Sequence, residues 1–246
     1  MDVSDLDDRF LASFVLGNLD YDAQLLAIKR LLRRHKEADE QLVKEIEDIK
    51  AFAERASGAA NERAVDDLVD HFHYSVFQDA AHSMAAVGML APFVESLFRQ
   101  SFFGIRELFA LDGASFEDHL RSSMPPRQQW DCRYATSGKN LVEGIKQLSE
   151  ATGLADDLPA DLSRTLGALF RYRNKMFHLG FEWPQVERTR FERAIVAEGW
   201  PQEWFTKATS GGEPWIFYVS EVFINHCLQI IDDVLLGLGA FVRRRA

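Results

Sequence analysis

The chain has 246 residues, of which 47% are apolar and 27% are charged, a balance typical of a globular protein rather than a disordered one. Its net charge of -10 argues against indiscriminate nucleic-acid binding, because phosphate contacts are normally supplied by a basic surface. No stretch approaches the roughly 18 to 20 uninterrupted apolar residues of a membrane helix, and the first residues do not resemble a signal peptide. Two cysteines are too few for a disulfide framework, so we expect a cytoplasmic protein without membrane association.

The N-terminal region is predicted to form amphipathic helices. Apolar residues recur at three- and four-residue spacing over 6–16 and again over 21–32, with a break at Gly17. A further apolar stripe crosses a charged segment that stops at Gly58, which predicts a third, partly exposed helix. We assign residues 1–74 to an accessory helical region.

The helical pattern resumes near Asn61 and continues to about Leu90. Pro92 lacks the backbone donor that a helix interior needs, so we expect a kink or a restart there before the pattern continues to Asp112. Small side chains in this segment would allow close contact with another helix. They are Ala80, Ala81, Ala85, Ala86 and Gly88.

The C-terminal half is also predicted to be helical, and no segment alternates as a strand would. Residues 112–138 are predicted to be a long connection with one short helix from Ser115. The predicted helices after it cover residues 139–151, 160–179 and 215–242, with Gly180 as the stop of the second.

Two groups of side chains are expected to be structural. The terminal Arg243, Arg244 and Arg245 should form a solvated tail beside the negative end of the last helix. Several aromatic residues follow Gly180, and we expect them to pack over the helices more readily than to stack RNA bases. The tryptophans among them are Trp183, Trp200, Trp204 and Trp215.

The chemically specific segment lies near the end of the helix predicted over 160–179. Arg173 and Asn174 are followed, after three residues, by His178, within apolar flanks. Cleaving RNA without a metal requires a group that moves the 2′-hydroxyl proton and a cation that stabilises charge on the phosphate. Histidine and arginine supply these two roles, and an asparagine can orient either one. The surrounding segment 164–193 is locally basic, with seven basic residues (Arg164, Arg171, Arg173, Lys175, Arg188, Arg190, Arg193) against three acidic ones (Glu182, Glu187, Glu192).

This Arg-Asn-x3-His segment resembles the signature of HEPN domains, which are helical bundles that include metal-independent RNases. The resemblance covers about residues 75–242 and implies an up-and-down helical bundle over 75–246, with extra N-terminal helices. It implies RNA as the substrate and a homodimer whose two motifs form a composite site, as in toxins or antiviral defence effectors. It also implies an antitoxin or other regulatory partner, although Gly180 replaces the tyrosine that a partner nucleotidyltransferase modifies in some HEPN toxins.

Other residues are assigned supporting or structural roles. Glu95 and Arg99, one turn apart, are similar to a polar pair on another helix of such domains, and Lys175 is a further supporting cation. An Arg-to-His spacing also occurs at Arg30–His35, which we interpret as a solvated helix end. No metal or other cofactor is expected. The alternative function is a non-catalytic HEPN-like dimerisation, adaptor or RNA-binding module, in which the motif is simply an exposed helix end.

Overall fold

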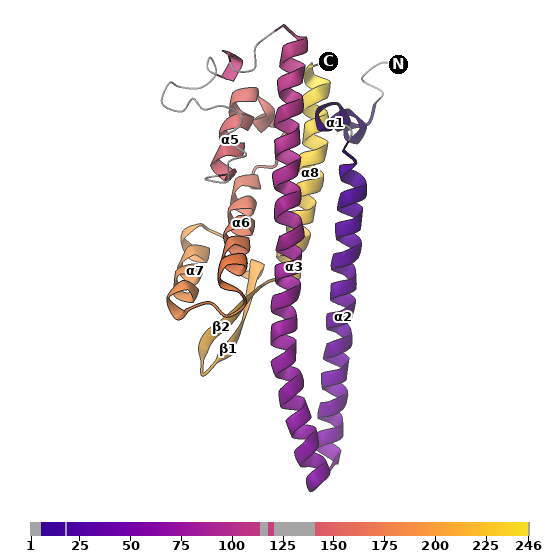
Figure 1. The fold of residues 1–246 in the computed structure, drawn as a ribbon, viewed down its shortest axis with the longest axis vertical. Helices are drawn as coiled ribbons and strands as arrows, with labels where there is room; N and C mark the ends of the chain where they lie inside the picture. Colours follow the sequence, from indigo (N-terminus) through magenta and orange to yellow (C-terminus); the bar gives the residue numbers. More distant parts are fainter. Residues whose placement is uncertain (1–5, 18, 114–117, 121–140, 246) are drawn as a thin grey trace. The chain divides into compact units, whose positions relative to one another are not determined.

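The computed structural model describes residues 6–17, 19–113, 118–120 and 141–245. Within these residues the protein is predominantly helical, which confirms the expected helical class (Figure 1). The helix predicted from Ser115 begins outside the described residues. The helices are α1 (Asp8–Leu16), α2 (Tyr21–Arg55), α3 (Ala59–Leu111), α5 (Leu141–Thr152), α6 (Leu162–Leu179), α7 (Gln185–Ala197) and α8 (Glu221–Arg245), with short 3-10 helices η3 (Leu154–Asp157) and η4 (Gln202–Trp204), and the strands are β1 (Phe205–Ser210) and β2 (Glu213–Val219).

The chain forms two compact units, each built from separate segments. The first unit comprises Met1–Asp22, Leu90–Arg171 and Asn225–Ala246, and the second comprises Ala23–Met89 and Tyr172–Ile224. Helices α2, α3, α6 and α8 therefore contribute residues to both units. The predicted division between residues 74 and 75 stays a prediction.

Glycines let helix backbones approach closely in the first unit. A Cβ atom on Gly104 of α3 would lie 2.1 Å from the backbone oxygen of Val15 in α1. One on Gly239 of α8 would lie 1.9 Å from the backbone oxygen of Asp8, at the start of α1. Real Cβ atoms do not approach other atoms this closely, so α1 packs on α3 and α8 only because both positions lack a side chain.

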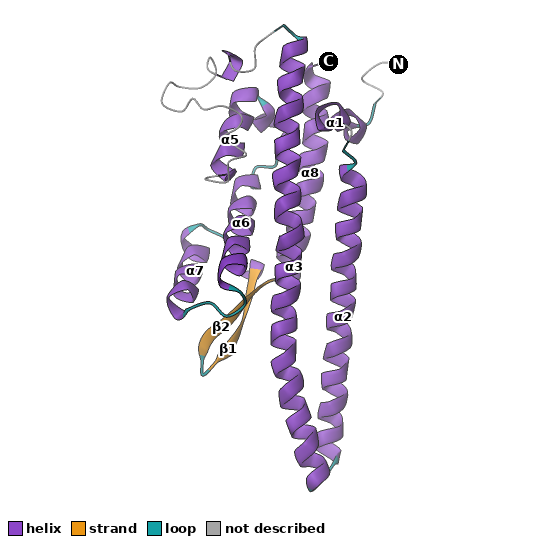
Figure 2. Ribbon diagram, viewed as in Figure 1, coloured by secondary structure: helices purple, strands orange, loops and turns teal. Residues whose placement is uncertain are grey.

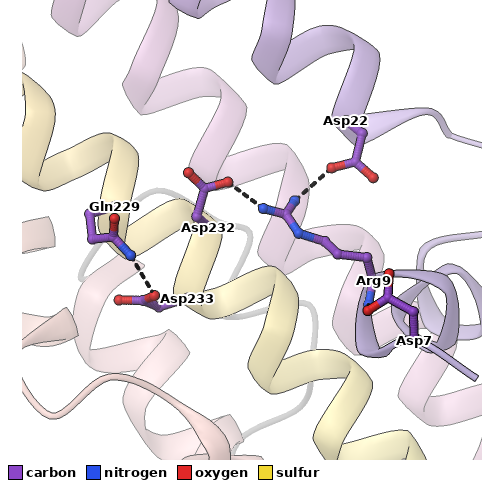
Figure 3. Close-up of polar contacts among 6 residues, drawn as sticks. All are labelled: Asp7, Arg9, Asp22, Gln229, Asp232 and Asp233. Carbon is purple, nitrogen blue, oxygen red and sulfur yellow. Dashed lines mark hydrogen bonds and ion pairs between the residues drawn. The ribbon is translucent and has the colours of Figure 1, made fainter.

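An ionic cluster ties the first turn of α1 to its neighbours in the first unit. Arg9 donates to the carboxylate of Asp22 at 2.6 Å and also to the carboxylate of Asp232 in α8 (Figure 3). The side chain of Asp7 accepts a hydrogen bond from the backbone nitrogen of Arg9 and caps the helix. Arg9 thus joins the start of α2 to α8.

The C-terminal arginines belong to α8 and bind other elements, so they do not form a free tail, although Arg244 and Arg245 are exposed as expected of solvated residues. Arg243 donates to the carboxylate of Asp8 at 2.8 Å. Arg244 pairs with a carboxylate of η3, and Arg245 donates to the carbonyl oxygen of Thr152 at 3.1 Å. Each guanidinium therefore holds the last turn of α8 against a different element of the first unit.

In the second unit, α2 runs side by side with the first part of α3 (Figure 1). The helix is continuous across residues 33–41, so the predicted division into two helices is wrong. This charged stretch consists mainly of good helix formers, and its weak apolar pattern reflects exposure rather than a break. Polar contacts fix the register of the two helices. Gln78 donates to Asp39 at 2.9 Å, and Asn61 donates to the carbonyl oxygen of Ala53 at 2.7 Å.

A β-hairpin follows α7, and the expectation of a chain without strands is wrong (Figure 2). Strands β1 and β2 pair antiparallel through Gly211 and Gly212, whose φ angles of 59° and 83° suit a two-residue hairpin turn. Residues 215–219, predicted as helical, therefore belong to β2, and α8 begins at Glu221. The side chain of Ser220 accepts a hydrogen bond from the backbone nitrogen of Phe223, which defines this helix start.

Aromatic side chains form the core around this hairpin in the second unit. Tyr172 is fully buried, and its hydroxyl donates to the carbonyl oxygen of Phe217 at 2.8 Å. The rings of Trp183 and Phe217 stack at 5.6 Å. Three of the four tryptophans after Gly180 are buried, which confirms their packing role. These are Trp183, Trp200 and Trp204.

Helix α3 continues through Pro92, so the helix does not restart there. A proline at this position removes the donor to the carbonyl of Gly88, four residues earlier.

Helices α3 and α8 are each long and apolar enough to cross a membrane by length and composition. Half of the most apolar window in each helix is buried inside the protein. The core helices of soluble proteins have the same property, so this finding leaves the localisation open.

Candidate functional site

Helix α6 presents the predicted motif on its surface. Leu166, Leu169, Tyr172 and Met176 form a buried stripe at three- and four-residue spacing, which fixes the rotation of the helix. The helix ends where Gly180 adopts a φ of 72° and donates from its backbone nitrogen to the carbonyl of Met176 at 3.0 Å. The predicted stop at Gly180 is confirmed.

The three motif residues lie on the solvent side of this last part of α6. Arg173 donates from Nη1 to Oδ1 of Asn174 at 2.9 Å. Asn174 and His178 are exposed and lie one helical turn apart. Within the described residues, neither Arg173 nor His178 forms an ion pair, so both side chains remain available to an external group.

An exposed aromatic ring accompanies the motif. Phe177 has 54% of its surface exposed to solvent, although the preceding residue, Met176, is buried. The guanidinium of Arg173 lies 5.7 Å from the centre of this ring. A Cβ atom on Gly88 of α3 would lie 3.1 Å from the ring edge, so Gly88 leaves the space in which Phe177 sits. The motif therefore combines a cation, an imidazole and an open aromatic face.

Lys175 has a structural partner in the second unit. It forms an ion pair with Glu187 of α7, whose other carboxylate oxygen accepts from Arg190 at 2.6 Å. The hydrogen bond from Lys175, with the positive charges of Lys175 and Arg190, lowers the pKa of Glu187. This geometry assigns Lys175 to holding α7 against α6.

Each acidic residue of segment 164–193 has a hydrogen-bond or ion-pair partner other than Arg173. Glu182 accepts from the indole nitrogen of Trp215 at 2.6 Å, and Glu192 pairs with Lys207. Glu187 is engaged as described above. None of these carboxylates neutralises Arg173, so the basic character expected from the sequence persists beside the motif.

Glu95 and Arg99 belong to the first unit, where α3 places them one turn apart. Glu95 is half-buried and Arg99 is exposed. In the described part of the chain no ion pair joins them. Their supporting role stays a prediction.

A second group of polar side chains was not predicted as a site, although Asp79 and His82 belong to it and were weighed from the sequence as possible metal ligands. The imidazole rings of His35 in α2 and His82 in α3 stack in parallel, with centres 4.6 Å apart. Nδ1 of His82 lies 2.7 Å from Oδ1 of Asp39, at ion-pair distance, although the approach does not meet hydrogen-bond geometry. His35 is half-buried, so the prediction of a solvated helix end is wrong. The available signal was His35-x3-Asp39 together with Asp79-x2-His82, two pairs at helical spacing.

The described residues contain no group of three or more His, Cys, Asp or Glu side chains arranged to hold a metal ion. Comparison with known proteins adds no assignment, because no family model, curated protein or solved structure matches this chain.

Proposed function

We propose that this protein is a metal-independent endoribonuclease of the HEPN type, with its active site at the C-terminal end of α6. The observation that carries the proposal is the group formed by half-buried Arg173 with exposed Asn174 and His178, which meets no carboxylate partner within the described residues. Surface arginines are commonly engaged by nearby carboxylates. Here the carboxylates of the same segment are occupied elsewhere, which favours an anionic substrate such as RNA.

The proposed reaction is attack by the 2′-oxygen of a ribose on the adjacent phosphorus. His178 accepts the 2′-hydroxyl proton as the new O–P bond forms. The bond from phosphorus to the 5′-oxygen breaks, and the departing oxygen takes a proton from an imidazolium, either that of the same His178 or that of His178 in a second copy. The products are a 2′,3′-cyclic phosphate and a 5′-hydroxyl, and the step needs neither water nor a metal.

Arg173 and Asn174 have complementary roles in this proposal. The guanidinium of Arg173 stabilises the charge that develops on the phosphate oxygens. The hydrogen bond that it donates to Asn174 orients the planar group along the surface of α6. The exposed ring of Phe177 offers a surface on which an unpaired base can stack.

One histidine must serve as both base and acid in a single copy of the motif. The resemblance to HEPN domains therefore supports a homodimer in which a second α6 completes the site. The same resemblance supports a cytoplasmic toxin or antiviral defence effector with a regulatory partner.

The test is cleavage of a mixed RNA pool in excess EDTA. His178→Ala and Arg173→Ala should each lower the cleavage rate by about 100-fold or more, the usual contribution of such groups. His71→Ala and Arg63→Ala are matched controls, because both residues lie on α3 away from the motif, and they should cleave as the wild type does.

Product ends provide the chemical check. Cleaved RNA should carry cyclic phosphates and 5′-hydroxyls, and a DNA copy of the same sequence should remain intact because it lacks the attacking 2′-oxygen. If the folded wild type leaves every RNA intact, the enzyme proposal fails, and a non-catalytic helical dimerisation, adaptor or RNA-binding module is the better description. If His178→Ala cleaves at the wild-type rate, the active site proposed on α6 is refuted.

A further inference from the structure

A pocket of about 620 Å³ lies within the second unit. Helices α2 and α3, the end of β2 and the first turn of α8 line it, together with the stacked rings of His35 and His82. Leu32, Val219 and Ile224 supply apolar wall, and more apolar than polar surface faces the cavity. This volume lies in the range of small-molecule sites, and the apolar wall can hold an apolar body.

The charges around the pocket favour a cation. Five carboxylates line it against two lysines, and one of these lysines, Lys36, is already paired with Glu221 at 3.2 Å. The carboxylates belong to Asp39, Glu40, Glu47, Asp79 and Glu221. Asp39 also faces His82 and accepts from Gln78, so its charge is largely satisfied within the protein.

Asp79 has no such partner in the described residues. Although the residue as a whole is exposed, burial of the carboxyl and then the negative charge of Asp39 raise its pKa to about 6, against a smaller opposing effect of His82. A cation placed beside this carboxyl would favour its charged form and so oppose both effects.

Tyr218 gives a second, independent observation at this pocket. Its side chain lines the pocket and is only 8% exposed, yet its hydroxyl has no hydrogen-bond partner among the described residues. Leaving a buried hydroxyl unpaired costs about 1–3 kcal/mol in general, so such groups usually meet a ligand or water. Burial and the charge of Asp79 raise the pKa of Tyr218, so the phenol stays neutral and can accept from an N–H group.

We propose that this pocket binds an organic cation, with an ammonium group held between the Asp79 carboxylate and the Tyr218 hydroxyl and an apolar body against Leu32, Val219 and Ile224. The Val219 wall is fixed to α3, because the backbone nitrogen of Val219 donates to the side chain of Ser83 at 3.1 Å. Both helices and the hairpin therefore shape the pocket. This site is separate from the α6 motif, and its occupation does not depend on ribonuclease activity.

The test uses three probes of similar shape and different charge on the full chain. These are phenethylamine, 2-phenylethanol and phenylacetate, measured by isothermal titration calorimetry near neutral pH. Phenethylamine should bind saturably with a Kd of about 1 mM or tighter, and at least about 10-fold more tightly than either other probe. Equal binding of 2-phenylethanol, or no saturable binding of phenethylamine, overturns the proposal.

Variants locate the binding site. Asp79→Asn and Tyr218→Phe should each weaken phenethylamine binding, by about 10-fold for the carboxylate and by about 3-fold or more for the hydroxyl. Asp66→Asn is the matched control, because it removes an exposed carboxylate from α3 outside the pocket and should leave the Kd unchanged. Equal losses in Asp66→Asn and Asp79→Asn would show that only the overall charge matters and would refute the site.

Discussion

The close approach of α1 to α3 predicts an unusual cost for a small substitution. In Gly104→Ala, the new Cβ atom would lie 2.1 Å from the backbone oxygen of Val15, more than an ångström inside ordinary contact. The obstacle is backbone, so α1 must shift and disturb the fully buried Val15 and Leu11. Overpacking of this kind costs about 1–3 kcal/mol and more when backbone must move, while replacing glycine by alanine in a helix gains about 1 kcal/mol. We expect a net loss of about 2 kcal/mol.

Gly167→Ala is the matched control within the same unit. No atom lies within 4 Å of a Cβ built on Gly167 of α6, so the same substitution should stabilise the protein by about 0.5–1 kcal/mol. Thermal and urea unfolding followed by circular dichroism should show Gly104→Ala melting roughly 4–8 °C below the wild type and Gly167→Ala slightly above it. If Gly104→Ala were as stable as Gly167→Ala, α1 would not pack on α3 at Val15 and the reasoning would fail.

Three further predictions concern single substitutions in the second unit. Gly180→Ala should destabilise by about 1 kcal/mol in urea unfolding, because the φ of 72° is strained for any residue with a side chain, and an unchanged midpoint would argue against this helix end. Tyr172→Phe should lower the free energy of unfolding by about 1–2 kcal/mol, because the carbonyl oxygen of Phe217 loses a buried donor. The urea midpoint of this variant is compared with that of the wild type, and equal midpoints would show that the hydrogen bond does not stabilise the core. Burial and Asp39 raise the pKa of Asp79 from 3.8 to about 6, so the stability that its protonated carboxyl contributes is lost as pH rises through this window. The urea midpoint of Asp79→Asn should therefore rise relative to that of the wild type between about pH 4 and about pH 7. A difference between the two midpoints that stays the same across this range would contradict the raised pKa.

Helices were predicted where the sequence has a strong apolar period and a clear stop. Helix α6 is the best case, because a buried residue recurs every third or fourth position up to Gly180. The middle of α2 has no such period, because none of residues 33–41 is buried, and only the helix propensity of this stretch indicated continuity. The hairpin was missed because β2 is a nearly continuous apolar run, which looks the same in a buried helix, and the Gly211-Gly212 turn was the one distinguishing signal.

The two candidate sites differ in how far sequence could indicate them. Arg173, Asn174 and His178 lie within six residues, so one helix suffices to place them and their shared exposure followed from the buried face. The pocket needs His35 beside His82, and this contact depends on the register of α2 against α3. Apolar periodicity sets which face of a helix is buried, but it does not set how far one long helix slides along another.

The bond between Arg243 and Asp8 spans 235 positions of the chain and has a consequence for synthesis. At about 5–20 residues per second, roughly 10–50 s pass between translation of the α1 segment and translation of the α8 residues that cover it. During this interval Leu11 and Val15, which are fully buried in the finished protein, lack their final neighbours. Until α8 has been made, the nascent α1 segment therefore exposes apolar side chains that the finished protein buries.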